Sequence, residues 1–294
     1  MKSIVVTGGS GNAGSAIIKD LLAHGYAVMN VDLTAPREQL CHFFRADLTD
    51  FGQAVEAIRR AAGTVDRRRS PLGEAQGVVH MAGIPAPSLA SDAVTFHNNL
   101  TSTYNVFSAA TLFGLERVVW ASSETVYGLP LTRSPPRSAP IGEDHPLAPE
   151  TGYALAKALC EDMARQMQRW NPRTTFIGLR ISNIFDAADY AAIPSFWSDL
   201  ELRKWNLWSW VDSRDVARAC RLGLEAEVAG AHVCTIAAAD TLMRRSSREL
   251  MAAAFPTVPV RADLGEFETL LSIEAARRLL GYRPIHTWRT SAIR

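Results

Sequence analysis

The stretch from residue 7 to residue 14, Thr-Gly-Gly-Ser-Gly-Asn-Ala-Gly, constrains the fold of this chain more than any other. Gly8, Gly11 and Gly14 lie between a β-branched segment, Ile4–Thr7, and a segment with helical spacing, 16–24. Glycine permits a tight turn and lets backbone N–H groups approach a phosphate, while the N-terminus of the following helix favours negative charge. In this strand–turn–helix context the glycines predict a dinucleotide-binding βαβ unit.

Strand and helix patterns alternate along the first half of the chain. This alternation predicts an α/β fold, a Rossmann doubly wound parallel sheet with helices on both faces. Apolar spacing predicts a helix over Phe51–Ala62. Further helices are expected over 96–113, 153–170, 215–225, with its start at Asp212 or Ser213, and 272–280. Strands are expected over 4–7, 27–31, 77–81, 117–121 and 174–179. Segments 63–74 and 129–149 are expected to be loops.

Charge and cysteine usage exclude several classes of protein. The 294 residues include 31 Lys and Arg against 30 Asp and Glu, so no net field attracts nucleic acid or an anionic membrane. No apolar run is long enough to span a bilayer, and the first residues lead directly into a strand without room for a signal peptide. The four cysteines lack metal-ligand spacing, so we expect no metal, free thiols and a cytoplasmic location.

Asp32 follows the second expected strand, where a carboxylate can accept hydrogen bonds from an adenosine ribose. A carboxylate there also repels a 2′-phosphate, so NAD is favoured as cofactor over NADP. Arg37 weakly favours NADP instead, because a nearby arginine could bind that phosphate. Asp47 and Leu48 follow the third expected strand and are expected to bracket the adenine.

Tyr153 and Lys157 are four residues apart in an expected helix, so they share one face of it. A free tyrosine has a pKa of about 10, and a neighbouring ammonium is expected to lower it. The phenol could then take a proton from a substrate hydroxyl while a hydride leaves the same carbon. Ser123, which follows another expected strand, would position the substrate oxygen.

Together these motifs resemble those of the extended short-chain dehydrogenase/reductases, also called the NAD-dependent epimerase/dehydratase family. The resemblance covers about three quarters of the chain and implies a seven-stranded Rossmann domain, bound NAD and a catalytic group of Ser123, Tyr153 and Lys157. It also implies that Asn99 stabilises the site and that helices 96–113 and 153–170 form a four-helix bundle in a homodimer. The matching motifs are TGGSGNAG (7–14), Asp32, Asp47-Leu48, HMAG (80–83), Asn99, SSETVYG (122–128), YALAK (153–157), LRISNIF (179–185) and WVDSRDVARA (210–219).

The resemblance yields a set of candidate site residues. The catalytic candidates are Ser123, Tyr153, Lys157 and Asn99. The cofactor-binding candidates are Gly8, Ser10, Gly11, Asn12, Ala13, Gly14, Asp32, Asp47, Leu48, Met81, Ala82, Gly83, Asn99, Ala121, Tyr153, Lys157 and Ile181. The substrate candidates are Pro85, Ser123, Glu124, Asn183, Trp197 and Arg203.

Two departures from the family pattern narrow the expected reaction. Sugar dehydratases of the family place a glutamate base where this chain has Thr125, which cannot remove a C–H proton, so dehydration is not expected. The segment between Asn183 and Val211, which wraps the nucleotide diphosphate in many family members, is short here and carries Asp186 and Asp189. A smaller, unactivated sugar or sugar acid is therefore favoured over a nucleotide sugar.

Four tryptophans crowd this short segment, at positions 197, 205, 208 and 210. They form either an apolar core of a small lobe or an aromatic wall against a sugar ring, with Arg203 or Lys204 pairing a substrate carboxylate. The expected domains are 1–182, with 211–238 returning to it, for NAD, and 183–210 with 239–294 for substrate.

Three functions remain open at this stage. The favoured one is an NAD-dependent oxidoreductase that acts on a hydroxyl-bearing carbon of a carbohydrate-like substrate. The second is a nucleotide-sugar 4-epimerase, of the UDP-glucose type, that keeps NAD bound and returns the hydride to the other face. The third is a non-catalytic NAD-binding regulatory protein, which the presence of Ser123, Tyr153 and Lys157 disfavours.

Overall fold

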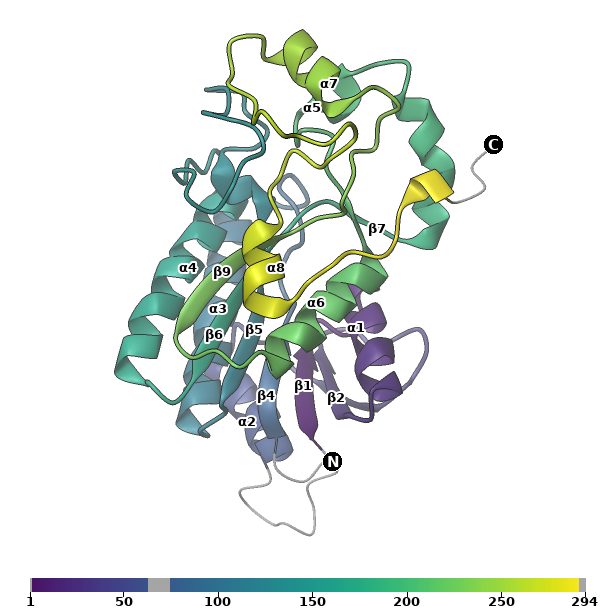
Figure 1. Cartoon of the computed structure of the whole chain (residues 1–294). Helices are drawn as coiled ribbons and strands as arrows, with labels where there is room; N and C mark the ends of the chain where they lie inside the picture. Colours follow the sequence, from purple (N-terminus) through teal and green to yellow (C-terminus); the bar gives the residue numbers. More distant parts are fainter. Residues whose placement is uncertain (1, 63–74, 291–294) are drawn as a thin grey trace.

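A computed structural model describes residues 2–62 and 75–290 and contains a seven-stranded parallel sheet (Figure 1). The strand order is β3-β2-β1-β4-β5-β6-β9, so the chain reverses direction across the sheet between β1 and β4. The predicted Rossmann fold is confirmed. The strands are β1 (Ser3–Thr7), β2 (Ala27–Asp32), β3 (His42–Arg45), β4 (Ala75–His80), β5 (Arg117–Ser123), β6 (Thr175–Ile181) and β9 (Ala231–Ile236).

Helices cover both faces of this sheet (Figure 1). Side chains of β1 alternate between the faces, because successive residues of a strand point in opposite directions. Ile4 and Val6 join a core with Ile17 of α1, whereas Val5 joins a second core with Ile58 of α2. The first face carries α1 (Asn12–Ala23), α6 (Ser213–Glu225) and α8 (Glu274–Leu280), and the second carries α2 (Phe51–Ala62), α3 (Asp92–Leu112) and α4 (Gly152–Trp170).

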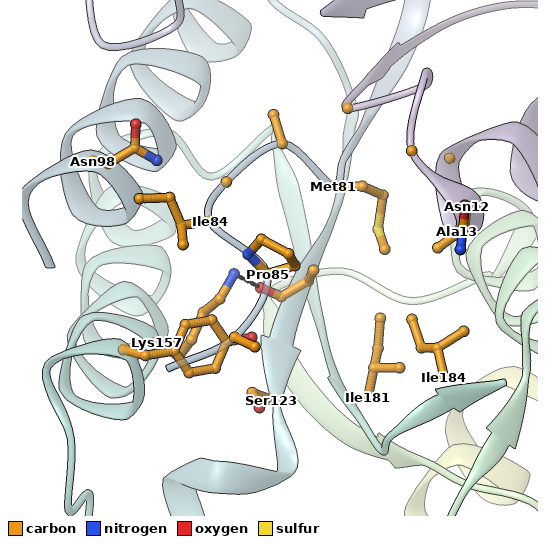
Figure 2. Close-up of a pocket in the computed structure, with 18 of the residues that line it drawn as sticks. Asn12, Ala13, Met81, Ile84, Pro85, Asn98, Ser123, Lys157, Ile181 and Ile184 are labelled. Atoms are coloured by element: carbon orange, nitrogen blue, oxygen red, sulfur yellow. Dashed lines mark hydrogen bonds between the residues drawn. The ribbon is translucent and has the colours of Figure 1, made fainter. Parts of the chain in front are cut away.

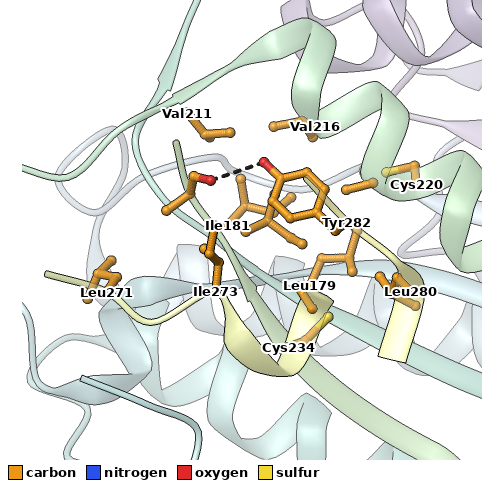
Figure 3. Packing of buried hydrophobic residues seen from close by; sticks show 14 of the residues in the cluster. Leu179, Ile181, Val211, Val216, Cys220, Cys234, Leu271, Ile273, Leu280 and Tyr282 are labelled. Atoms are coloured by element: carbon orange, nitrogen blue, oxygen red, sulfur yellow. Dashed lines mark hydrogen bonds between the residues drawn. The ribbon is translucent and has the colours of Figure 1, made fainter. Parts of the chain in front are cut away.

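The first core continues from the sheet to the C-terminal part of the chain. Figure 3 shows Leu179 and Cys234 of the sheet against Cys220 of α6 and Leu280 of α8. The hydroxyl of Tyr282 lies in this core and donates a hydrogen bond to the carbonyl of Ala237 at 3.1 Å. The C-terminal segment is thereby fixed to the Rossmann sheet.

A smaller set of elements lies beyond the C-terminal ends of the sheet strands (Figure 1). It has its own apolar cluster, which includes Phe185, Ile193, Leu242 and Trp288. The elements are β7 (Ile184–Phe185), which pairs in parallel with β8 (Val211–Asp212), the 3₁₀ segments η2 (Ala187–Phe196) and η3 (Trp288–Thr290), and the helices α5 (Glu201–Lys204) and α7 (Ser247–Ala254). A further 3₁₀ turn, η1 (Glu124–Tyr127), follows β5 directly.

Most predicted elements are present, with shifts at their ends. Helix α2 has the predicted bounds, and α6 begins as predicted after Asp212, whose carboxylate accepts from the backbone N–H of Arg214. Helix α1 begins at residue 12 instead of 16, and α3 at residue 92 instead of 96, where the side chain of Ser91 caps it. Strand β9 was not predicted, and segment 63–74 lies outside the described residues. Within the described part of the chain, no helix is both long and apolar enough to cross a membrane.

Candidate active site

A cavity of about 1230 Å³ opens along the C-terminal ends of β1, β2, β4, β5 and β6. In a parallel sheet this edge, at the point where the strand order reverses, is where ligands bind. The structure brings almost all predicted cofactor residues to this cavity. Lining it are Gly8, Ser10, Gly11, Asn12, Ala13, Gly14, Asp32, Asp47, Leu48, Met81, Ala82, Gly83, Ala121, Tyr153, Lys157 and Ile181.

At Gly8 and Gly14 the glycine turn between β1 and α1 has no room for a side chain. Gly8 has a φ of +71°, and a Cβ there would lie 2.6 Å from the backbone nitrogen of Ala82. A Cβ on Gly14 would lie 2.1 Å from the carbonyl oxygen of Gly8. The turn therefore packs backbone against backbone and leaves a cradle at the start of α1 that fits a pyrophosphate.

Asp32, at the end of β2, is held close to this turn. Its Oδ2 accepts from the backbone N–H of Ser10 at 3.1 Å, and its Oδ1 accepts from the N–H of Thr34 at 3.1 Å. The Ser10 hydroxyl in turn donates to the carbonyl of Thr34 at 2.7 Å. These bonds fix a carboxylate beside the phosphate cradle, which suits the hydroxyls of an adenosine ribose. Arg37 lines the same end of the cavity.

Ser123, Tyr153 and Lys157 line the same cavity from the end of β5 and the first turns of α4. The Lys157 ammonium donates to the carbonyl of Ala121 at 2.6 Å (Figure 2) and lies 5.7 Å from the centre of the Tyr153 ring. The Ser123 Oγ accepts from the N–H of Thr125 at 3.2 Å and from its hydroxyl at 3.0 Å. Thr151 caps α4 by accepting from the N–H of Ala154, which fixes the turn that carries Tyr153. The three side chains thus line the same cavity as the glycine turn.

The pKa of Tyr153 differs from the sequence-based expectation. Burial raises it to about 12, the neighbouring Ser123 hydroxyl opposes the rise and the charge of Glu124 adds to it. Lys157 was expected to lower this pKa, and that expectation is wrong for this geometry because burial dominates and the ammonium is directed at the Ala121 carbonyl. Burial also lowers the pKa of Lys157.

Asn99 does not line the cavity, although it was predicted both as catalytic and as cofactor-binding. Its Oδ1 accepts from the N–H of Ile84 at 2.8 Å, and its Nδ2 donates to the carbonyl of Ile84 at 3.0 Å. Asn99 therefore clamps the loop after β4 and shapes the wall that carries Ile84 and Pro85. The neighbouring Asn98, which was not predicted, lines the cavity instead (Figure 2).

Five of the six predicted substrate residues line the cavity: Pro85, Ser123, Glu124, Asn183 and Arg203. The structure does not bring Trp197 there. Its ring packs against Trp288, with centroids 5.4 Å apart, and its Nε1 donates to the carbonyl of Leu242 at 3.0 Å. Trp208 and Trp210 are fully buried, so this segment mainly builds the apolar lobe, and Trp205 is its one tryptophan that lines the cavity.

Glu124 is only 3% exposed, and its Oε1 accepts from Nδ2 of Asn206 at 3.2 Å. Burial raises its pKa to about 7, against the opposing effects of Asn206 and of the charge on Arg203. Other lining residues were not predicted. They include Leu33, Ala86 and Pro87 of loops, Asn98 of α3, Ile184 of β7 and Asp186.

The fold and this cavity define a dinucleotide-binding α/β protein of the short-chain dehydrogenase/reductase class. The family model described as "NAD dependent epimerase/dehydratase family" matches residues 4–237. The chain belongs to this family, as the sequence motifs predicted.

Individual relatives agree with this assignment. UDP-glucose 4-epimerase of Bacillus subtilis is 32% identical over 199 residues, which cover 63% of this chain and 53% of the relative. UDP-glucose 4-epimerase of Neisseria meningitidis is 29% identical over 210 residues, which cover 66% of this chain and 56% of the relative. The chain thus spans about half the length of the curated relatives it matches.

Solved structures share the fold. A short-chain dehydrogenase/reductase superfamily protein from Agrobacterium tumefaciens with bound NAD has a TM-score of 0.71 at 23% identity, covering 98% of this chain and 94% of that chain. UDP-glucose 4-epimerase from Brucella ovis in complex with NAD also has a TM-score of 0.71, at 20% identity and the same coverage of both chains.

Proposed function

We propose that this chain is an NAD-dependent oxidoreductase that transfers hydride at a hydroxyl-bearing carbon of a sugar or sugar-acid substrate. One observation supports this proposal above all others: Ser123, Tyr153 and Lys157 line one cavity together with the glycine turn and Asp32. A hydride acceptor and an acid–base group are the two parts that such a reaction needs.

The cradle fits NAD. Gly8 and Gly14 allow the backbone of the turn to pack closely where a Cβ would clash, so the backbone at the start of α1 would hold the pyrophosphate. Asp32 would accept hydrogen bonds from the adenosine ribose and would disfavour a 2′-phosphate, so NADP fits less well. When bound, NAD supplies the hydride acceptor.

The acid–base role falls to Tyr153. In the oxidative direction its phenol would take the proton of the substrate hydroxyl, and Ser123 would hold the same oxygen by a hydrogen bond. A phenol with a pKa near 12 is a poor base at neutral pH, so it needs a positive charge to favour the phenolate. Lys157 would supply that charge if its ammonium turned from the Ala121 carbonyl toward the phenol.

A nucleotide-sugar 4-epimerase is the second candidate, and it is favoured by the names of the relatives, which are UDP-glucose 4-epimerases. It would use the same three residues, but the hydride would return to the other face of the sugar. The absorbance of NADH separates the two functions. A dehydrogenase accumulates NADH during turnover, whereas an epimerase shows no net change.

Tyr153→Phe tests the shared site. We expect this variant to bind NADH as the wild type does, measured by fluorescence titration, because the phenyl ring keeps the packing. Turnover should fall roughly 100- to 10,000-fold, the usual contribution of general acid–base catalysis. Full activity in Tyr153→Phe would overturn the assignment, and so would failure of the wild type to bind NAD(H).

Three further proposals complete this function. We propose that residues 1–182 with 211–238 bind NAD and that residues 183–210 with 239–294 form the substrate lobe. Helices α3 and α4 pack against each other and would form a four-helix bundle with those of a second copy. We also propose that the protein works in the cytoplasm, where the buried thiols of Cys160, Cys220 and Cys234 would stay reduced.

A further inference from the structure

Arg203 is a buried arginine in the wall of the cavity that forms no ion pair with any described residue. Only 8% of its surface is exposed. Its hydrogen bonds to the protein run through Nη2, which donates to the Asn183 Oδ1 at 2.8 Å and to the Ser209 carbonyl at 3.3 Å. Its Nε is buried without a hydrogen-bond partner among residues 2–62 and 75–290. Buried charges in proteins are normally paired, and although Glu124 interacts with this guanidinium through its charge, no described carboxylate forms an ion pair with it.

Aromatic rings hold the guanidinium in place. Its central carbon lies 5.5 Å from the ring centre of Phe185, 5.4 Å from that of Phe196 and 5.1 Å from that of Trp205. Such stacking orients the planar fork and excludes water, which strengthens its interaction with an incoming anion. The side chain is therefore arranged in advance for a planar, charged partner.

This position lies close to the reacting group. Asn183, which Arg203 contacts, also lines the cavity, and Asn206 of the same segment donates to Glu124, the residue after Ser123. We propose that Arg203 binds the carboxylate of a sugar-acid substrate whose hydroxyl-bearing carbon faces Ser123 and Tyr153. This inference rests on the proposed function and specifies its substrate class.

The charges around Arg203 favour a carboxylate over a diphosphate. On the walls formed after β4, β5 and β6 and by α4 and α5, the charged lining residues are Lys157 and Arg203, against Glu124 and Asp186. The Lys157 ammonium already binds the Ala121 carbonyl and belongs to the Tyr153 site. One guanidinium then remains, which matches the single charge and two oxygens of a carboxylate. A diphosphate would bring two negative charges toward Asp186 as well.

Lys204 is the natural comparison, since the sequence alone did not distinguish it from Arg203. Its ammonium binds the carboxylate of Glu201 at 3.2 Å on the surface, and it does not line the cavity. A role in substrate binding is therefore expected of Arg203 and not of Lys204.

The experiment compares D-glucuronate, which carries a carboxylate, with D-glucose, which carries a hydroxymethyl group at the same carbon. UDP-glucose is the third ligand and tests whether Arg203 binds a diphosphate instead. Wild type, Arg203→Met, Arg203→Lys and the control Lys204→Gln are saturated with NADH, and sugar binding is measured by calorimetry. Turnover with NAD is measured in parallel as kcat and KM. Arg203→Lys keeps the charge without the fork, so it tests the same contact if Arg203→Met does not fold.

Tighter binding of glucuronate than of glucose by the wild type is expected. Arg203→Met should weaken glucuronate binding about 10- to 100-fold, as for loss of a hydrogen bond to a charged group, and weaken glucose binding much less. The affinity of Arg203→Lys for glucuronate should lie between those of the wild type and Arg203→Met, and the affinity of Lys204→Gln should match that of the wild type. Equal losses for both sugars, or Arg203-dependent binding of UDP-glucose with no binding of glucuronate, would overturn the inference.

The same measurements separate this inference from the proposed function. Arg203-dependent binding of glucuronate without NADH formation from any sugar would support the inference and count against the oxidoreductase. NADH formation from neutral sugars, with no dependence on Arg203, would support the oxidoreductase and count against the inference about Arg203.

Discussion

Glu124, the residue after Ser123, is a carboxylic acid whose burial raises its pKa from an ordinary value of 4.5 to about 7. Between these two pH values the folded chain holds a proton that the unfolded chain has released. The unfolded state therefore binds fewer protons, and stability falls as the pH rises from about 4.5 to about 7. The loss is on the order of 3 kcal/mol, because one pKa unit corresponds to about 1.4 kcal/mol.

Glu124→Gln removes this penalty, because glutamine keeps the shape and cannot ionise. We expect the variant to gain stability relative to the wild type as the pH is raised from about 4.5 to about 8, measured by urea unfolding at both pH values. If the free energy of unfolding of the variant differs from that of the wild type by the same amount at both pH values, Glu124 does not titrate as a buried carboxyl. Glu56 supplies the control, since its hydrogen bond to Arg59 lowers its pKa to about 2, so Glu56→Gln should destabilise the chain at the higher pH.

Single residues of the site differ in how far the sequence could place them. The roles of Gly8 and Gly14 were predictable, because the close backbone contacts at these positions require glycine. The pKa of Tyr153 and the position of Trp197 were not, because both depend on burial and on partners such as Trp288 that are distant in the chain. Spacing of four residues places Lys157 near Tyr153 but does not say where its ammonium points.

At the scale of elements, α4 is fixed to the sheet by a buried ion pair. Glu161 follows Lys157 by one helical turn, and its Oε2 lies 2.7 Å from the Nη2 of Arg180 on β6. Its Oε1 accepts from Nε of Arg180 at 2.9 Å and from the Ser122 hydroxyl on β5 at 2.7 Å. The guanidinium also lies 4.7 Å from the ring centre of Tyr127. This network sets the position of the helix that carries Tyr153 and Lys157.

Glu161→Gln should therefore cost about 3–5 kcal/mol of stability, since it leaves the Arg180 charge buried and uncompensated. Chemical denaturation measures the loss. The adjacent Asp162→Asn is the matched control, because its ion pair with Arg165 is largely exposed and should contribute less than about 1 kcal/mol. Adding Arg180→Met to Glu161→Gln should restore part of the stability, as both charges are then absent. Equal losses in Glu161→Gln and Asp162→Asn would refute this account.

The helices show where the apolar periodicity of the sequence is enough to predict an element and its bounds. Helix α2 was predicted with its bounds, because one apolar stripe against a polar face specifies an amphipathic helix by itself. The start of α1 was missed, because Asn12 and Gly14 in its first turn carry no apolar pattern. The four-residue helix α5 was not predictable, since so short a helix forms only through contacts such as those of Arg203 with Phe196.

At the scale of the whole molecule, the topology accounts for the site. The cavity is lined by residues from position 8 to position 205, and they meet because parallel strands end at one edge of the sheet. Once the strand order is known, the residues that follow each strand in the sequence can be placed at this edge. The small lobe closes the cavity from beyond the edge, and its residues, Arg203 among them, could not be ranked from the sequence because their packing is irregular.

The opposite side of α3 and α4 leads to a prediction about assembly. Apolar side chains remain exposed there, at Val94, Tyr104 and Leu112 of α3 and at Leu155 and Leu159 of α4. Contiguous apolar surface is typical of protein–protein interfaces, and we propose that a second copy covers these residues. If a second copy covers them, the wild type should have twice the 32.1 kDa mass of one chain in light scattering after size exclusion.

Leu159→Glu should return the particle to the mass of one chain, because the interface would have to bury a charge without a partner. Its circular dichroism should stay that of the wild type, since position 159 faces outward within the chain. Ile285→Gln, at an apolar residue that is exposed elsewhere on the molecule, should leave the mass unchanged. A wild type of single-chain mass, or a Leu159→Glu variant that keeps the double mass, would remove the four-helix bundle as the mode of assembly. Since Tyr153 and Lys157 lie on the same helix as Leu155 and Leu159, a bundle of this kind would also hold the turn of α4 that carries Tyr153 from its outer side.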